Sequence, residues 1–136
     1  MKNHPNIEDL KPKIKLGIKF WLEFENKSVL GSGWAELLEI IKKNDGGSLT
    51  QAAKECTQKK KEGYSYKYAW NILKRIENRT GLSPVITGKG GLGGGGWVKL
   101  NDWGKYLLMT YKKLMTEIEG IEKKLEKSLK IDQYAK

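Results

Sequence analysis

The sequence predicts a mostly α-helical chain with a small β-hairpin and a long helix at its C-terminus. Apolar residues recur at helical spacing in several segments, and two strand-like segments flank a glycine-rich loop. The last helical pattern is much longer than the others. The chain has 136 residues, of which 38% are hydrophobic. This length and composition fit one domain with an attached helix.

The N-terminal third predicts an arm, a strand and a helix. Residues 1–17 contain prolines and little periodicity, so we expect a loose arm. The β-branched and aromatic run Ile18–Phe24 predicts a strand, and no partner strand is evident nearby. A helix is expected from Trp34, with Ser32 or Gly33 as its N-cap. An Asn-Asp-Gly-Gly turn ends this helix.

A pair of helices is expected in the middle of the chain. Ser48–Gln58 predicts a short helix capped by Ser48 or Thr50. Its inner face consists of small residues, which allow close approach of another helix: Ala52, Ala53 and Cys56. Cys56 is the only cysteine, so we expect a buried apolar side chain there.

The second helix of the pair begins after Ser65, a good N-cap. It ends at Thr80-Gly81, and Pro84 follows shortly after. Its apolar residues fall on one face: Ala69, Ile72, Leu73 and Ile76. Either Tyr66 or Trp70 is expected to flank this face.

Two short strands are expected directly after this helix. They cover residues 85–88 and 97–100, and the loop KGGLGGGG joins them. A helix pair followed by such a hairpin predicts a winged helix-turn-helix, with the hairpin as the wing. The alternative is a low-complexity glycine stretch. A phosphate-binding P-loop does not fit, because the loop lacks Gly-Lys-Ser/Thr and does not begin a helix. A dinucleotide fingerprint does not fit either, because no βαβ unit surrounds it.

The C-terminal segment predicts a long helix from the capping pair Asn101-Asp102 to about Lys130. Six apolar residues in it are spaced 4, 3, 4, 3 and 4, as in a coiled-coil seam: Leu107, Tyr111, Leu114, Ile118, Ile121 and Leu125. Such a helix is longer than its domain is wide, so its far end extends beyond the domain and its apolar stripe needs a partner chain. We therefore expect the seam to hold a homodimer together. The alternative is an amphipathic helix packed on its own domain. The predicted organisation is an arm (1–17), a winged helix-turn-helix domain (18–101) and a dimerisation helix (102–136).

Positive charge is concentrated around the predicted helix pair. The formal net charge is +10. Residues 54–80 contain eight Lys/Arg and three Asp/Glu, so this segment has a net charge of 8 − 3 = +5. That is half of the net charge of the whole chain. A basic cluster on one part of a small domain indicates a polyanionic partner. On a helix-turn-helix, that partner is double-stranded DNA.

Three blocks of sequence resemble the N-terminal DNA-binding domain of the molybdate-responsive regulator ModE. They are GSLTQAAKE at 47–55, SYKYAW at 65–70, and GKGGLGGGGWVKL at 88–100 followed by Asn-Asp-Trp-Gly. The resemblance covers about two thirds of the chain, from about Phe20 to Leu114. It implies a winged helix-turn-helix of the type also found in LysR regulators, with dimerisation through the flanking helices.

Two departures from the ModE pattern limit what the resemblance implies. The segment Thr57–Tyr64 lengthens the turn between the paired helices and adds three consecutive lysines. The relative angle of the two helices is therefore less certain than in the family. No second β-rich segment follows the long helix, so molybdate sensing is not expected.

The expected interface consists of the second helix, the start of the first, the long turn and the wing. Lys67 suits guanine, Asn71 suits adenine, and Ser65 suits a base or a phosphate. The two tyrosines either pack or contact phosphate, and cations farther along the helix suit the DNA backbone. The first turn of the preceding helix is expected to bind phosphate through its backbone N–H groups. The full candidate set is Thr50, Gln51, Lys59, Lys60, Lys61, Ser65, Tyr66, Lys67, Tyr68, Asn71, Lys74, Arg75, Lys89 and Lys99.

Catalysis and cofactors are not expected. The chain has one histidine, His4, and one cysteine, which provides neither a Ser-His-Asp set nor the ligands of a zinc site. No signal peptide or membrane span is evident, so a cytoplasmic, nucleoid-associated protein is expected. The leading hypothesis is a homodimeric, sequence-specific transcriptional regulator, and the sequence does not identify an effector. Alternatives are a sequence-tolerant architectural DNA-binding protein and a protein-interaction adaptor.

Overall fold

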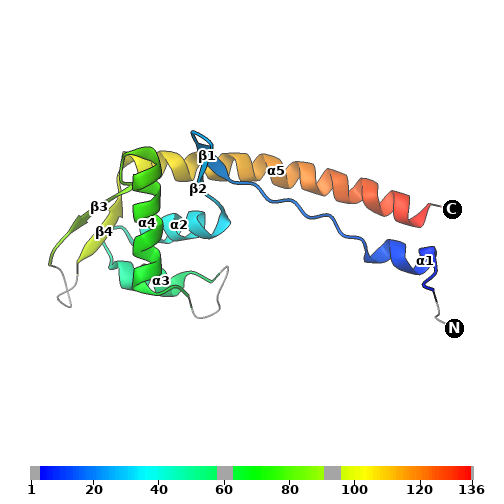
Figure 1. Cartoon of the computed structure of the whole chain (residues 1–136), viewed down its shortest axis with the longest axis horizontal. Coiled ribbons are helices and arrows are strands. Elements are labelled where there is room, and N and C mark those ends of the chain that lie inside the picture. Colours follow the sequence, from blue (N-terminus) through cyan, green and yellow to red (C-terminus); the bar gives the residue numbers. More distant parts are fainter. Residues whose placement is uncertain (1–3, 58–62, 91–95, 136) are drawn as a thin grey trace. The chain divides into compact units, whose positions relative to one another are not determined.

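The computed structural model describes residues 4–57, 63–90 and 96–135. The chain forms two compact units (Figure 1). The core unit is Phe20–Lys112, and the tail unit combines Met1–Lys19 with Lys113–Lys136. The expected mostly helical chain with a small hairpin and a long C-terminal helix is confirmed.

A β-hairpin opens the core unit. The expected strand is shorter than predicted, since β1 covers only Leu22–Phe24. Its partner, which the sequence did not reveal, is β2 at Lys27–Leu30. Glu25 and Asn26 between them both have positive φ angles, of 47° and 70°. Such a two-residue turn matches the twist of the paired strands, and Asn tolerates it well.

Helix α2 spans Ser32–Asn44 and follows the hairpin directly. It starts earlier than predicted. Its N-cap is Gly31, and neither Ser32 nor Gly33 caps it. Of the apolar residues at helical spacing, Leu37, Leu38 and Ile41 are buried, whereas Trp34 and Ile40 are half-buried.

Helices α3 (Leu49–Glu55) and α4 (Tyr66–Thr80) are the predicted pair. The Ser48 hydroxyl accepts a hydrogen bond from the backbone N–H of Gln51, and the Ser65 hydroxyl accepts one from Tyr68. Both serines are therefore N-caps, as expected. The predicted inner faces are confirmed, because these residues are all buried: Ala52, Ala53, Ala69, Ile72, Leu73 and Ile76.

The long turn between α3 and α4 is closed at its base. Cys56 and Tyr64 are both buried, and the backbone N–H of each donates to the carbonyl of Ala53, at 3.2 and 2.9 Å. Gly63 has a φ of 82°, and a Cβ there would collide with the Lys54 backbone. The chain therefore leaves and returns at the last turn of α3. The predicted site residues Lys59, Lys60 and Lys61 lie outside the described residues.

The second hairpin forms where it was predicted. Strands β3 (Val85–Gly88) and β4 (Trp97–Leu100) are antiparallel, with Gly88 opposite Trp97. The Trp97 indole covers Gly88, where a Cβ would collide with the ring. Val98 also exchanges backbone hydrogen bonds with Gly46 and Gly47 in the α2–α3 turn. The hairpin is thus held to the helical part of the core unit.

Helix α5 runs from Asp102 to Tyr134, slightly longer than expected. Its N-cap is Asn101, whose side-chain oxygen accepts from the Gly104 backbone at 2.8 Å. Gly104 lies so close to Pro84 that a Cβ would collide with the Pro84 carbonyl oxygen.

The predicted seam on α5 is not one continuous surface. Leu107 and Tyr111, which were assigned to a contact between chains, are buried within the core unit of their own chain. The Tyr111 ring stacks on Phe20, with 4.7 Å between ring centroids. This part of α5 follows the alternative expectation of an amphipathic helix packed on its own domain.

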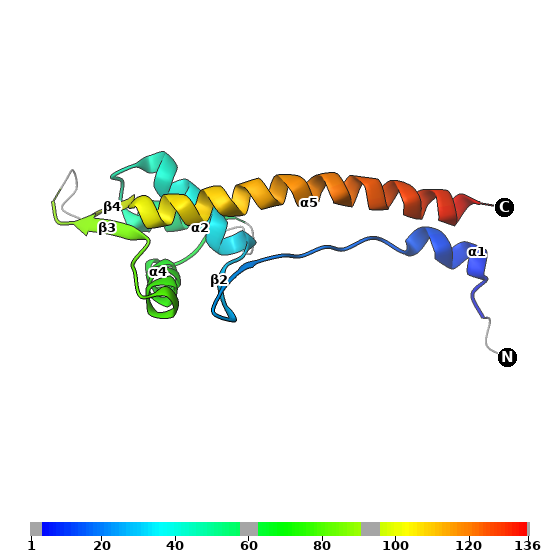
Figure 2. The same cartoon turned by 90° about the horizontal axis from the view of Figure 1, so that it is seen from above.

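The N-terminal arm is more ordered than the expected loose segment. It contains α1 (Ile7–Leu10) and the short 3-10 helix η1 (Lys11–Lys13). Both views show the arm running back along the distal part of α5 (Figures 1 and 2). The Gln133 amide donates to the carbonyls of Lys11 and Ile14, at 2.6 and 2.9 Å. Because this contact joins distant parts of the sequence, local periodicity could not predict that the arm is ordered.

The two α5 glycines provide a first test of the packing. Gly104→Ala is expected to lower the free energy of unfolding by about 1–3 kcal/mol, because the added methyl group has no space. Gly120→Ala is the matched control, since no atom lies within 4 Å of its added Cβ. That change is expected to stabilise the helix by about 1 kcal/mol. Urea unfolding followed by circular dichroism measures both. Equal effects of the two substitutions would contradict the close approach at Pro84.

Cys56 provides a second test. Burial raises the pKa of its thiol from 9.0 to about 12, and the charges of Glu36 and Glu55 add to the rise. At pH 8 we expect iodoacetamide to label the folded protein at least about a hundredfold more slowly than the urea-unfolded chain, because thiolate is the reactive form. The thiol ionises near pH 9 only when unfolded. Its stabilising contribution is therefore complete below pH 9 and is lost as the pH rises toward 12. Equal labelling rates would show that the thiol is accessible.

Candidate nucleic-acid interface

The exposed face of α4 is basic and polar. None of the exposed residues of α4 is acidic, and they are Tyr66, Lys67, Tyr68, Asn71, Lys74, Arg75 and Asn78. The opposite face is buried against the rest of the core unit. The helix is therefore held by its apolar side and presents cations and amides to solvent.

Lys67 and Asn71 lie one turn apart on this exposed face, near the N-terminus of α4. Lys67 forms no ion pair with any other residue in the described parts of the chain. Its ammonium is thus available to a ligand. Ser65 is exposed, but its hydroxyl already accepts the capping hydrogen bond from Tyr68. It keeps its O–H donor for a base or a phosphate.

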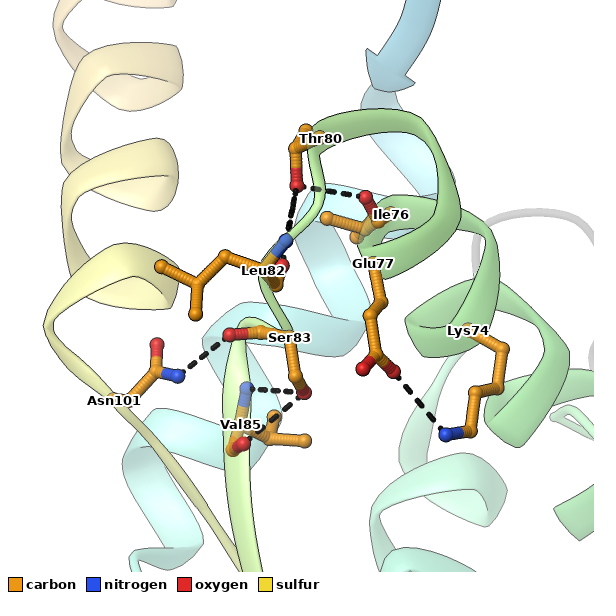
Figure 3. Close-up of polar contacts among 8 residues, drawn as sticks. All are labelled: Lys74, Ile76, Glu77, Thr80, Leu82, Ser83, Val85 and Asn101. Atoms are coloured by element: carbon orange, nitrogen blue, oxygen red, sulfur yellow. Dashed lines mark hydrogen bonds and ion pairs between the residues drawn. The ribbon is translucent and has the colours of Figure 1, made fainter.

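Lys74 is less available than its sequence position indicated. Its ammonium forms an ion pair with Glu77 at 3.1 Å (Figure 3). The same ammonium lies 5.0 Å from the centroid of the Trp70 ring, and the Tyr66 ring stacks on that indole with 6.4 Å between ring centroids. The pairing neutralises much of the charge of Lys74 at this point of the helix.

A groove of about 210 Å³ separates this side of α4 from β3. One wall comes from α4, and the other comes from Ser83 and from strand β3. Its lining includes an indole, an ion pair and two hydroxyl-bearing residues: Trp70, Leu73, Lys74, Glu77, Ser83, Val85 and Thr87. The Asn101 amide donates to the Ser83 carbonyl at 2.6 Å, so the hairpin wall is held in place (Figure 3).

On the other side of α4, arginines contact an aromatic ring of α2. The guanidinium groups of Arg75 and Arg79 each lie 5.8 Å from the Trp34 ring centroid. Arg79 also donates to the backbone carbonyl of Ser28 in β2. Arg79 therefore joins α4 to the first hairpin. Arg75 is exposed and remains accessible.

The start of α3 differs from the expectation in one respect. Thr50 and Gln51 are both exposed in its first turn. The backbone N–H of Gln51 is already bonded to the Ser48 hydroxyl, so it is not free to bind a phosphate. The side chains of both residues remain available.

The β3–β4 hairpin contributes two exposed lysines. Lys99 projects from β4, and its ammonium lies 5.6 Å from the Trp97 ring centroid. Lys89 follows β3 at the start of the glycine-rich loop. The loop residues 91–95 lie outside the described residues.

The predicted site residue Tyr68 on α4 packs at an angle against the buried Tyr64, with 4.7 Å between ring centroids.

Two residues of this surface were missed by sequence reasoning. Asn78 is exposed and shares the helical phase of Lys67 and Asn71, and that phase was the available signal. Trp70 was expected only as a flank of the core. Its half-exposed ring lies in the groove beside β3, which depends on the position of the hairpin.

The described ranges contain no group of three or more His, Cys, Asp or Glu residues arranged to hold a metal ion. Among the helices described, none combines the length and the apolar character needed to cross a bilayer. No protein-family model matches the chain, and no curated protein matches it.

Proposed function

We propose that this protein is a sequence-specific regulator that binds double-stranded DNA as a homodimer through a winged helix-turn-helix. In this proposal α3 and α4 are the helix pair, α4 is the recognition helix, and the β3–β4 hairpin is the wing. The three blocks that resemble the ModE DNA-binding domain support the assignment.

The observation that carries the proposal is the exposed face of α4. It displays cations and amides, and the one acidic residue of the helix, Glu77, is half-buried and paired with Lys74, whereas the other face is buried. Phosphates attract the cations, and amides and lysines are the side chains that hydrogen-bond to base edges in the major groove.

The contacts of individual residues indicate which of them suit base edges and which suit phosphates. Lys67 and Asn71 are suited to base edges, because both are exposed near the start of α4. Arg75 and the hairpin lysines Lys89 and Lys99 are suited to phosphates or to the minor groove. Lys74 is suited to a phosphate only when it leaves Glu77, so it is expected to contribute less.

Salt dependence tests the mode of binding. If a dimer makes six or more phosphate contacts, its affinity is expected to fall by about 10³-fold or more between 50 and 200 mM salt. Fluorescence anisotropy with a labelled duplex, selected from a random library, measures this slope. A flat response contradicts binding through the basic face of α4. Absence of duplex binding at moderate salt favours the protein-interaction alternative.

Lys67→Ala tests the role of the recognition helix. It is expected to weaken binding to the selected duplex by about 1–3 kcal/mol, and to weaken binding to random DNA less. Lys123→Ala, on the distal part of α5, is the charge-matched control and is expected to change neither affinity appreciably. An equal loss on both duplexes would make Lys67 a phosphate contact. A wild-type preference well below about 10³-fold would favour an architectural protein.

A further inference from the structure

The N-terminal arm contains a stretch of backbone without hydrogen bonds. After η1, residues 14–19 form neither a helix nor a turn, and both views show them extended along the distal part of α5 (Figures 1 and 2). No backbone N–H or carbonyl of residues 15–19 bonds to another residue in the described parts of the chain. An extended segment with unpaired backbone groups is a template to which another strand can add.

The side chains of this open segment alternate between apolar and basic. Ile14 is exposed, and Leu16 and Ile18 on the same face are half-buried. The arm lysines are all exposed, and none forms an ion pair with a residue that the structure describes: Lys13, Lys15 and Lys19. The open segment therefore has an apolar face and a face with unpaired cations.

Burial identifies the α5 residues that face the arm. Half-buried residues recur at helical spacing on the distal part of α5: Met115, Ile118, Glu122, Leu129 and Gln133. Gln133 in this row donates to the arm carbonyls of Lys11 and Ile14. The arm therefore lies along this row of α5.

Only one side of this row is apolar. The apolar stripe consists of three residues that are 39%, 53% and 45% exposed: Leu114, Ile121 and Leu125. At about 3.6 residues per turn, the stripe lies roughly 80° around the helix from the row that faces the arm. The opposite side of the row is polar, with Glu119, Lys123 and Lys130 exposed. A strand that adds to the arm on the stripe side buries apolar surface, whereas a strand on the other side does not.

We propose that the tail unit binds an extended acidic segment of another protein, which adds to the arm as a β-strand over the apolar stripe. Its alternate acidic side chains lie beside the arm lysines, and its alternate apolar side chains cover the stripe and Ile14. Backbone hydrogen bonds and cross-strand pairs of opposite charge stabilise the pairing. This site goes beyond the proposed function, since it uses none of the residues of the α4 face.

The arm and α5 together provide what a short added strand needs. A two-stranded ribbon is marginal alone and is stabilised when it packs against a helix, which here is α5. Residues 14–19 extend over roughly 17 Å at ~3.3 Å per residue. Leu114 to Leu125 spans roughly 16 Å of helix at ~1.5 Å per residue. A segment of six or seven residues therefore contacts both surfaces along its whole length.

A second copy of the arm is a poorer partner than an acidic segment. If two arms paired with their apolar faces on the same side, lysines would meet lysines across the ribbon, and like charges oppose such pairing. A register shifted by one residue would turn one apolar face to solvent. An acidic segment with alternating apolar residues has neither disadvantage.

The other exposed apolar side chains of the tail unit lie outside this site. Ile7 and Leu10 belong to α1, before the open backbone begins. Ile131 and Tyr134 are exposed and lie about 100° or more around α5 from the apolar stripe. Ile131 therefore provides a matched control for Ile121.

The probe is a capped, fluorescein-labelled heptapeptide in which glutamate and valine alternate, with glutamate at both ends. Fluorescence anisotropy with the full chain and no DNA is expected to give a dissociation constant of roughly 100 µM or tighter. The same peptide with lysine in place of glutamate is expected not to bind. Equal binding of the two peptides, or no binding of the glutamate peptide at about 500 µM protein, overturns the proposal.

N-methylation of the peptide tests the strand pairing. Alternate N–H groups of a strand point to the same edge, so methylating one alternate set blocks the edge that faces the arm and methylating the other set leaves it free. One methylated peptide is expected to bind about tenfold or more weakly, and the other to bind like the parent. If both lose binding or both keep it, the peptide does not bind as an added strand.

Variants of the protein locate the site. Ile121→Ser is expected to weaken peptide binding about tenfold or more, because it removes apolar contact, and Ile131→Ser is expected to leave it unchanged. Lys15→Glu is expected to weaken binding about tenfold or more. Lys67→Glu is its charge-matched control, because the basic face of α4 also attracts acidic peptides. Circular dichroism checks that each variant keeps its helices.

The outcomes separate this site from DNA binding and from self-association. A larger loss with Lys67→Glu than with Lys15→Glu places the peptide on the α4 face and overturns the arm site. If a second copy covers the stripe instead, Ile121→Ser lowers self-association in sedimentation equilibrium and the wild type does not bind the peptide, which also overturns it. Duplex binding is measured separately, so its absence contradicts the proposed function and leaves the peptide site intact.

Discussion

The junction of Asn101 with the segment Ser83–Pro84 controls the arrangement of the core unit. The Asn101 side chain donates to the Ser83 carbonyl and accepts from Gly104, and its backbone N–H donates to the Pro84 carbonyl. One residue thus ends β4, caps α5 and holds the segment that connects α4 to β3. The absence of a side chain at Gly104 permits this approach. Both the groove beside α4 and the direction in which α5 starts depend on this contact.

The α3–α4 pair is joined by a long turn that closes at its base. Ala53 accepts hydrogen bonds from Cys56 and from Tyr64, so the long turn begins and ends at one point of α3. The buried contact between small residues of the two helices is then independent of the length of the turn.

Both the charged and the apolar side chains fall into two groups, those engaged within the chain and those that remain exposed. Arg79 and Lys74 are engaged within the chain, while Lys67 and Arg75 remain accessible on the same helix. A similar division runs along α5. Its first apolar residues complete the core unit, and later ones such as Leu114, Ile121 and Leu125 are exposed.

The sequence by itself determined the elements whose signals are local. The caps Ser48 and Ser65, the buried faces of α3 and α4, and the strands around the glycine-rich loop were all predicted, because capping and helical periodicity depend on neighbouring residues. Tertiary structure alone decided the rest. The ordered arm needs Gln133, β2 needs a turn with positive φ angles, and the state of Lys74, Arg79, Leu107 and Tyr111 depends on which distant groups pack beside them. Contacts between residues far apart in sequence leave no periodic signal, so spacing could place these side chains on a face but could not identify what that face meets.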